Sequence, residues 1–355
     1  MTADAYAPDA PPIFCPIQPL PHPDPGEFIA ATTTWVSRFG LAEDPDYLHK
    51  SVLTGVAMTL CFYPDAPPPR LQDLCNYSAW AFILDDMIEN GQLGKRTCDV
   101  VPALSAFVRS TENPAARLLG DHPLDAAFAS MISDVHRWAS PVHRQRFTDS
   151  FREWMAGFIW ERSLQELHQP IDLNTYLPLR LTSAGAAQAI AMGEMCHDLE
   201  LSAQQRDHPA VTAASEAAMT VAVLDNDRYS HLKAVREEED STDIFTVIRN
   251  DNPHHTFRQA LHDGVALRDR CLTLYLRLRD QLLRHASPQL RTYFHILDLL
   301  IVGNIDFGAT CIRYLFPDSP GKDFPRTTTP LDPSTEPPSI PSIAWWWDQV
   351  DPTSL

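Results

Sequence analysis

The sequence predicts an all-α protein built as a single bundle of about ten helices. Apolar residues recur through the interior of the chain at the i, i+3, i+4 and i+7 spacing of helices. Residues that favour helices (Ala, Leu, Arg, Glu and Gln) are abundant there, and the whole chain has only 13 glycines. No segment shows sustained alternation of apolar and polar residues bounded by hairpin turns. These observations argue against a β-rich fold.

The helical pattern is divided by prolines, glycines and polar clusters, because an interior proline removes a backbone donor and clashes with the preceding turn. The predicted helices cover residues 26–38, 45–61, 69–91, 98–111, 122–138, 142–168, 173–200, 208–238, 241–250, 254–284 and 287–315. Residues 8–25 hold eight prolines, and residues 317–341 are again rich in proline. We therefore expect one domain at 26–316, flanked by extended, mobile tails at 1–25 and 317–355.

The bulk composition narrows the class of function. The chain carries 46 acidic against 28 basic residues, a net charge of −18, which argues against nucleic acid or an anionic membrane as the main partner. The sequence contains no run of about 18 apolar residues, so it predicts no membrane-spanning helix. The seven cysteines are scattered and odd in number, which is typical of free buried thiols in a reducing compartment. No signal peptide is apparent, so we expect a cytoplasmic protein.

The first chemical motif is an acidic box at the end of the predicted helix 69–91. Asp85 and Asp86 follow an apolar run, and Glu89 lies one turn later, so the three carboxylates can share one helix face. Neighbouring carboxylates repel each other and are tolerated when water or a divalent cation neutralises them. A solvated helix end before the Asn90–Gly91 turn is the alternative.

The second motif lies about 140 residues later, in the predicted helix 208–238. Asn226, Ser230 and position 234 are spaced four residues apart, within roughly 80° of one helix face and over about 12 Å. An amide, a hydroxyl and a carboxylate in this arrangement would suit one Mg²⁺, and Lys233 beside them would suit a phosphate. A polar stripe on a surface helix is the alternative.

Together the two boxes resemble the bacterial class I terpene synthases, which carry an aspartate-rich motif and an N-D-x-x-S-x-x-x-E motif at this separation. Two further features match the family: Arg180, which lies 46 residues before Asn226, and the pair Arg313–Tyr314 near the end of the helical region. The segment Thr182–Gly185 fits the family's helix break. The resemblance covers roughly residues 13–316 and implies a single-domain isoprenoid synthase bundle around a central apolar cavity.

The resemblance implies a role for each matching residue. Asp85, Asp86, Glu89, Asn226 and Ser230 would bind metal: three Mg²⁺ ions, with Mn²⁺ as a substitute. Arg180, Lys233, Arg313 and Tyr314 would bind the diphosphate, and the carbonyl of the break, assigned to Ala184, would help to trigger ionisation. Asp227 would orient a partner rather than bind metal.

The chain departs from the family at Ala234, where the family has a glutamate ligand. A water molecule would fill the vacant ligand position, or Glu237 would reach back from about 4.5 Å farther along the helix axis. We expect a weakened but working third metal site. A catalytically silent helical binding protein is the alternative from another class, and a chain-elongating prenyltransferase is disfavoured because the second box is not D-D-x-x-D.

The implied reaction is Mg²⁺-dependent ionisation and cyclisation of a linear prenyl diphosphate to a terpene hydrocarbon. Small residues near the helix break favour geranylgeranyl diphosphate and a polycyclic diterpene product, with farnesyl diphosphate as the alternative substrate. A homodimer is compatible with the resemblance.

Aromatic side chains are expected to line the cavity and face the carbocation. The candidates are Tyr77, Trp80, Phe82, Trp154, Phe158 and Phe307. The proline-rich tails, with Phe14 at one end and Trp345, Trp346 and Trp347 at the other, are candidate lids that would exclude water. Packing of the tryptophan run on the body is the alternative.

Overall fold

The computed structural model describes residues 10–237, 242–315 and 324–351, and most of these residues are helical. The helices are α1 (Gly26–Phe39), α2 (Pro45–Phe62), α3 (Pro68–Glu89), α4 (Thr97–Glu112), α5 (Pro123–His136), α6 (Pro141–Leu167), α7 (Leu173–Ser183), α8 (Ala186–Cys196), α9 (Ala203–Arg206), α10 (Pro209–Glu237), α11 (Ile244–Asp251), α12 (Phe257–Leu283), α13 (Pro288–Thr310) and α14 (Pro341–Ala344). Short 3-10 turns, η2 (Pro114–Ala116) and η4 (Trp347–Gln349), and two-residue strands, β1 (Ile13–Phe14) and β2 (Arg326–Thr327), complete the described elements.

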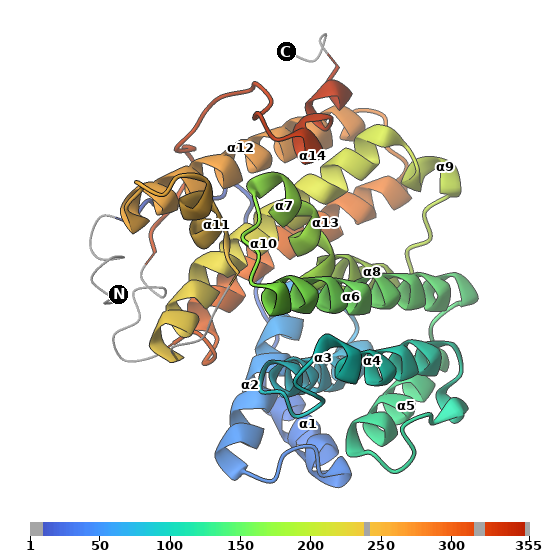
Figure 1. The fold of residues 1–355 in the computed structure, drawn as a ribbon. Coiled ribbons are helices and arrows are strands. Elements are labelled where there is room, and N and C mark those ends of the chain that lie inside the picture. Colours follow the sequence, from blue (N-terminus) through green and yellow to red (C-terminus); the bar gives the residue numbers. More distant parts are fainter. Residues whose placement is uncertain (1–9, 238–241, 316–323, 352–355) are drawn as a thin grey trace.

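The helices form one bundle that closes on itself. In Figure 1, α1 to α5 (blue to teal) lie at one end, α6 and α8 cross the middle, and α10, α12 and α13 (yellow to orange) form the other part. Helix α2 packs on α3, α4 on α6, α6 on α7, and α10 on both α12 and α13. Helix α13 also packs against α2, so the last long helix lies beside one of the first. This closure brings the acidic box of α3 and the end of α13 to the same cavity.

Local side-chain caps explain where several helices begin. Asp44 accepts hydrogen bonds from the backbone N–H groups of Asp46 and Tyr47, and Pro45 occupies the first turn of α2. Ser140 and Ser287 cap α6 and α13 in the same way. Thr256 and Gln259 form a reciprocal capping box at the start of α12. The helix boundaries predicted from the sequence agree with these starts to within a few residues.

One predicted helix is wrong as a single element. Residues 173–200 form two helices, α7 and α8, which are separated at Ala184 and Gly185. Gly185 adopts a left-handed conformation with φ of 70°, which breaks the helical hydrogen-bond ladder and costs glycine little. The break lies inside the segment that the family resemblance indicates.

Some residues of the two tails pack against the body, although most of the described tail residues are exposed or half-buried. Strands β1 and β2 pair in parallel, and the side chains of Ile13 and Phe14 are buried. In the C-terminal tail, Trp346 is fully buried and its indole N–H donates to Glu216 Oε2 at 2.7 Å. This tryptophan therefore packs on the body, which is the alternative to a lid.

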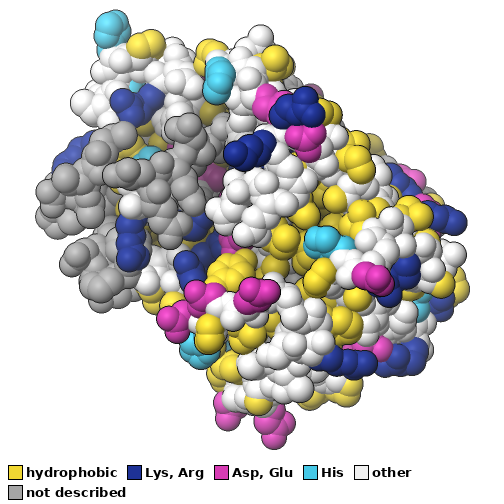
Figure 2. All heavy atoms as spheres, turned by 60° about the horizontal axis from the view of Figure 1, so that its bottom comes forward, with side chains coloured by type: hydrophobic (Ala, Val, Ile, Leu, Met, Phe, Trp, Pro, Cys, Tyr) yellow, Lys and Arg dark blue, Asp and Glu magenta, His cyan; other side chains and the backbone are white. Residues whose placement is uncertain are grey.

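Several surface features bear on the class of protein. None of the described helices is long and apolar enough to cross a membrane. All seven cysteines are unpaired thiols, of which Cys98 alone is exposed. Figure 2 shows basic and acidic side chains interspersed with apolar ones on the face that it draws.

Candidate active site

A cavity of about 580 Å³ lies between α3, α6, α8, α10 and α13. Polar and charged side chains from α3, α7 and α10 line it together with aromatic and aliphatic ones. It also takes residues from the helix break between α7 and α8 and from the segment after α13. Every predicted metal and diphosphate residue lines this cavity except Asp86, which lies beside it. Residues far apart in the sequence are therefore brought to one place.

The acidic box lies in the last turn of α3. Asp85 and Glu89 line the cavity, and the carboxylate oxygens of Asp85, Asp86 and Glu89 lie within 4.8 Å of one another. Asp85 keeps 28% of its side-chain surface accessible, because it faces the cavity rather than bulk water. Burial and the neighbouring Glu89 carboxylate raise the pKa of Asp85 to about 8. Without a cation, the box therefore holds a proton at neutral pH.

Asp86 is held by two neighbours. Its Oδ2 accepts a hydrogen bond from the Tyr47 hydroxyl at 2.9 Å, and its Oδ1 pairs with Arg313 Nη1 at 2.9 Å. Both oxygens are therefore engaged in the metal-free chain. Asp86 positions Arg313 in this state, whereas Asp85 and Glu89 present oxygens to the cavity.

The second box lies on α10, and Asn226, Ser230 and Ala234 all line the cavity. Asn226 Nδ2 donates to the Tyr314 hydroxyl at 3.0 Å, which leaves its carbonyl oxygen available as a ligand. Ala234 is buried and adds only a methyl group at the position of the family's glutamate. The side chain of Glu237, the predicted substitute, lies outside the described residues.

Contacts between side chains join the two boxes. Arg313 Nη2 lies 3.3 Å from Asp85 Oδ2, and the next residue, Tyr314, accepts from Asn226. Lys233 Nζ on α10 lies 3.7 Å from Glu89 Oε2 on α3. Asp85 and Asn226 thus share one cavity, as the family resemblance requires.

The third basic group, Arg180, is fixed by Asp227. Its Nη2 donates to Asp227 Oδ1 at 2.9 Å, and Asp227 also accepts from the Tyr176 hydroxyl and from the backbone N–H of Ile244. Burial raises the pKa of Asp227 to about 6, although Arg180 lowers it. Arg180 Nε has no hydrogen-bond partner among the described residues, so one buried donor remains for a ligand. Asp227 orients Arg180, in line with the role expected from the resemblance.

The helix break is held against α6 by close packing. The indole N–H of Trp154 donates to the carbonyl of Ser183 at 3.0 Å. A Cβ atom at Gly157 on α6 would lie 2.5 Å from Ser183 N, so only glycine allows this approach. Ala184 and Gly185 line the cavity beside these contacts. A glycine on α6 therefore sets the position of the break.

Most of the predicted aromatic wall is present. Tyr77, Phe82, Trp154, Phe158 and Phe307 line the cavity. The Phe307 ring lies 6.0 Å from that of Phe82 and 5.7 Å from that of Tyr314. Aromatic faces stabilise a nearby cation by about 0.5–2 kcal/mol each.

The prediction for Trp80 is wrong. Trp80 does not line the cavity: it is fully buried behind it and stacks on Phe128 with a centroid distance of 4.3 Å. Its indole N–H donates to the carbonyl of Leu124 at 3.1 Å. On α3 the cavity face carries Tyr77, Ala81 and Phe82, whereas Trp80 points toward α4 and α5.

Sequence reasoning missed two residues that support the acidic box. Tyr47 on α2 holds Asp86, and no pattern in the sequence links residues 39 positions apart. Arg162 on α6 donates to the carbonyl groups of Ile88, Gly94 and Lys95 at 2.9, 2.9 and 2.7 Å. It thereby fixes the end of α3, which carries the box, and the turn that follows α3.

The donor set of the cavity fits a hard divalent cation. Carboxylate, amide and hydroxyl oxygens are the ligands that Mg²⁺ prefers. Burial raises the pKa of Asp85 most and the neighbouring carboxylates of the box raise it further, and a bound cation would offset both effects. Asp85, Glu89, Asn226 and Ser230 are therefore the residues that would hold such ions.

Comparisons with known proteins agree with this site. Residues 76–272 match the family model described as terpene synthase family 2, C-terminal metal binding, which spans both boxes. Diterpene cyclase DtcycB from a Streptomyces species is 34% identical over 339 residues, which cover 95% of this chain and 96% of that protein. Spiroviolene synthase from Streptomyces violens is 29% identical, and the match covers 96% of this chain and 97% of that protein.

Solved structures show the same architecture. The SVS_A2 protein from ancestral sequence reconstruction superposes with a TM-score of 0.81 at 29% identity and covers 95% of this chain and 98% of its own. An α-eudesmol synthase shares the fold with a TM-score of 0.72 at 19% identity, covering 82% of this chain and 97% of its own.

The bundle and its divalent-metal-binding domain define a class I terpene cyclase, a lyase that acts on prenyl diphosphates. The chain belongs to terpene synthase family 2.

Proposed function

We propose that the chain cyclises geranylgeranyl diphosphate to a polycyclic diterpene hydrocarbon and releases diphosphate. The observation that carries this proposal is the single cavity in which both boxes meet an aromatic wall. Its volume of about 580 Å³ lies within the 300–1,000 Å³ that is usual for small-molecule sites. The relatives named as diterpene cyclases support the longer substrate.

Small side chains leave room for a long prenyl chain. Ala81, Ala184, Gly185, Ala186, Ala189 and Ala222 all line the cavity. Larger side chains at these positions would shorten the space available to the hydrocarbon. Farnesyl diphosphate remains the second candidate, because a relative at 25% identity is named as cyclising that substrate.

The basic groups are arranged to receive a leaving diphosphate. Arg180, Lys233 and Arg313 each pair with a carboxylate in the ligand-free chain, at 2.9, 3.7 and 2.9 Å. A diphosphate would compete for the same donors, and an arginine can fork across two of its oxygens. We assign Arg180, Lys233, Arg313 and Tyr314 to diphosphate binding on this basis.

We propose three Mg²⁺ ions as the resident metals, with Mn²⁺ as a substitute. Asp85 and Glu89 would hold ions on α3, with Asp86 beside them, and Asn226 and Ser230 would hold one on α10. Bound Mg²⁺ neutralises the charge that develops on the leaving diphosphate. Water would take the position that Ala234 leaves without a ligand.

The protein then has to protect a carbocation. Phe82 and Phe307 line the cavity, and Tyr77, Trp154 and Phe158 extend the wall. The carbonyl at the break, which we assign to Ala184, would orient the reacting end of the substrate. Exclusion of water by the proline-rich tails stays a prediction, as does a cytoplasmic location.

Incubation of the full chain with Mg²⁺ and C10, C15, C20 or C25 prenyl diphosphates tests the proposal. We expect a cyclic C20 hydrocarbon and stoichiometric diphosphate release, identified by gas chromatography with mass spectrometry. Turnover of the C15 substrate alone would refute the diterpene assignment and leave the cyclase class intact. A chelator should abolish release with every substrate.

A further inference from the structure

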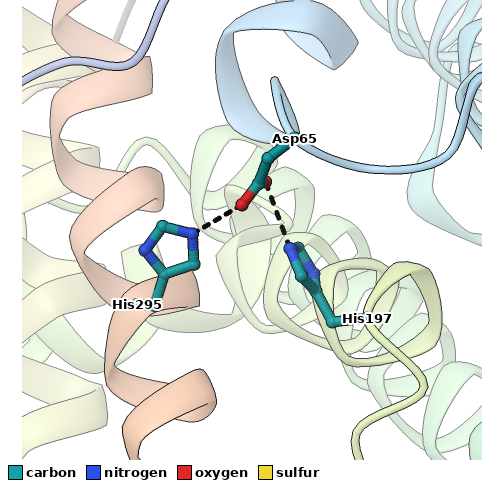
Figure 3. A group of neighbouring side chains, drawn as sticks. All are labelled: Asp65, His197 and His295. Atoms are coloured by element: carbon teal, nitrogen blue, oxygen red, sulfur yellow. Dashed lines mark hydrogen bonds and ion pairs between the residues drawn. The ribbon is translucent and has the colours of Figure 1, made fainter.

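A second group of metal-ligand side chains lies away from the active site (Figure 3). Asp65 sits in the loop between α2 and α3, His197 ends α8, and His295 lies on α13. One ligand atom from each lies within 4.8 Å of the others. None of the three lines the active-site cavity, and His295 precedes Phe307 on α13 by 12 residues, about 18 Å along the helix.

Both imidazole rings point one nitrogen at the same carboxylate. His197 Nε2 lies 3.1 Å from Asp65 Oδ1, and His295 Nε2 lies 2.7 Å from Asp65 Oδ2. The two rings are nearly perpendicular, with centroids 6.0 Å apart. Figure 3 shows the three side chains converging from three separate elements.

The other nitrogen of His197 is fixed by the backbone. His197 Nδ1 lies 2.8 Å from the carbonyl oxygen of Gly193, which can only accept a hydrogen bond. Nδ1 therefore carries a proton in either charge state of the ring. Nε2 donates to the Asp65 carboxylate when the ring is protonated, and it would offer its lone pair to an ion after losing that proton. Histidines that bind metals are usually oriented by a hydrogen bond of this kind.

A small ion could bind among these ligand atoms after they move apart by less than about 1 Å. Tetrahedral zinc with bonds of about 2.0–2.1 Å places neighbouring ligands roughly 3.3 Å apart. The observed separations are 3.1 Å from His197 Nε2 to Asp65 Oδ1 and 2.7 Å from His295 Nε2 to Asp65 Oδ2, so an ion would move these ligand atoms apart by about 0.2 and 0.6 Å. Two imidazoles and one carboxylate favour a transition metal over Mg²⁺, which prefers oxygen ligands. Asp65 and His295 are more than a third exposed, so ions and a completing water have access.

We propose that Asp65, His197 and His295 form a binding site for a divalent transition metal of the zinc class. The ion would tie the α2–α3 loop to the end of α8 and to α13. These elements already touch there, since a Cβ atom at Gly193 would lie 2.5 Å from Ile296 Cγ2. The bound ion would stabilise this end of the bundle, because it binds the folded chain and not the separated ligands.

Titration of the metal-stripped full chain with Zn²⁺ tests the site, with Mg²⁺ in excess to occupy the acidic box. Competition with a zinc indicator gives the stoichiometry and affinity, and the absorption spectrum of the Co²⁺-loaded chain gives the ligand geometry. His295→Asn, His197→Asn and Asp65→Asn each remove one ligand. His262→Asn is the matched control, since His262 is an exposed histidine beside an aspartate on α12.

We expect one equivalent of Zn²⁺ per wild-type chain, a tetrahedral or five-coordinate Co²⁺ spectrum and a higher melting temperature with Zn²⁺. Each ligand variant should lose at least about tenfold in affinity, whereas His262→Asn and Asp85→Asn should bind as the wild type does. Equal affinity in the wild type and in the folded ligand variants overturns the proposal. Binding that disappears in Asp85→Asn also overturns it, because the ion would then lie in the active site.

A purely hydrogen-bonded brace gives a different result. In that case the ligand variants would lower the melting temperature in the absence of metal, and Zn²⁺ would not raise that of the wild type. Asp65→Asn keeps the shape of the side chain, so it separates loss of a ligand from loss of packing if a histidine variant fails to fold.

Discussion

Arg313 reaches from the segment after α13 to the acidic box on α3, where its Nη1 lies 2.9 Å from Asp86 Oδ1. The same guanidinium lies over the ring of Phe82 at 5.2 Å and contacts Asp85 at 3.3 Å. One side chain thus touches the metal box and the cavity wall together. The geometry of this arginine, beyond its charge, should therefore matter for turnover.

Arg313→Lys should lower turnover by about 100-fold, because lysine keeps the charge but cannot fork across two oxygens. Steady-state diphosphate release measures the effect. Arg279→Lys is the control, since Arg279 Nη1 donates to both carboxylate oxygens of Asp298, at 2.9 and 3.0 Å, outside the cavity. Equal losses in the two variants would mean that the effect comes from stability alone.

Ala234→Glu should keep or raise turnover and lower the Mg²⁺ concentration for half-maximal activity. The new carboxylate would enter the cavity from the α10 face that carries Asn226 and Ser230. We expect a shift of about tenfold, which corresponds to about 1.4 kcal/mol. Ala234→Gln has nearly the same shape without the charge and should shift less. A large loss of activity in Ala234→Glu would show that the site is built around a small residue.

Phe307→Ala should change the product distribution more than the KM, because its ring lines the cavity and packs on Phe82. Product profiling by gas chromatography is the measurement. Trp80→Phe is the matched control outside the cavity. It should cost about 1 kcal/mol of stability for the lost hydrogen bond to Leu124 and leave the products unchanged. An unaltered profile in Phe307→Ala would remove Phe307 from the wall.

Gly157→Ala should reduce both stability and turnover. The added methyl group would press on the backbone of Ser183 at 2.5 Å and move the helix break. Overpacking of this kind costs about 1–3 kcal/mol, measured by thermal or denaturant unfolding. Gly26→Ala is the control, because a Cβ atom there meets nothing closer than Asp24 Oδ1 at 3.5 Å. If the break tolerates the methyl group, the two variants will unfold alike.

The affinity of the free protein for Mg²⁺ should rise as pH increases toward about 8. The pKa of Asp85 is raised to about 8 in the metal-free chain, so at pH values below it the carboxyl holds a proton that each binding event must release. Above that pH the proton is already lost and the affinity should level off. Calorimetry in buffers of different ionisation enthalpy measures the released proton. Asp85→Asn should weaken binding and flatten the pH dependence, and an unchanged slope in this variant would assign the proton to another group.

Sequence patterns predict much of the fold and of the site, because both depend on the spacing of residues along single helices. Helical periodicity and caps predict most helices to within a few residues, and the two boxes lie on faces set by the 3.6-residue repeat. The resemblance to a family added the basic residues, which no local pattern connects to the boxes. The predictions of helices and of the boxes succeeded because both depend on residues close together in the sequence.

What the sequence by itself determined is most of the long helices, the acidic and amide boxes and the family. Only the tertiary structure decided which side chains face the cavity: Trp80 turns away while Phe82 faces in, and Tyr47 and Arg162 hold the box from other helices. The physical reason is that a helix of mostly apolar residues, such as α3, does not reveal which of its faces meets a cavity and which meets another helix. That choice depends on the volume that the neighbouring helices leave unfilled.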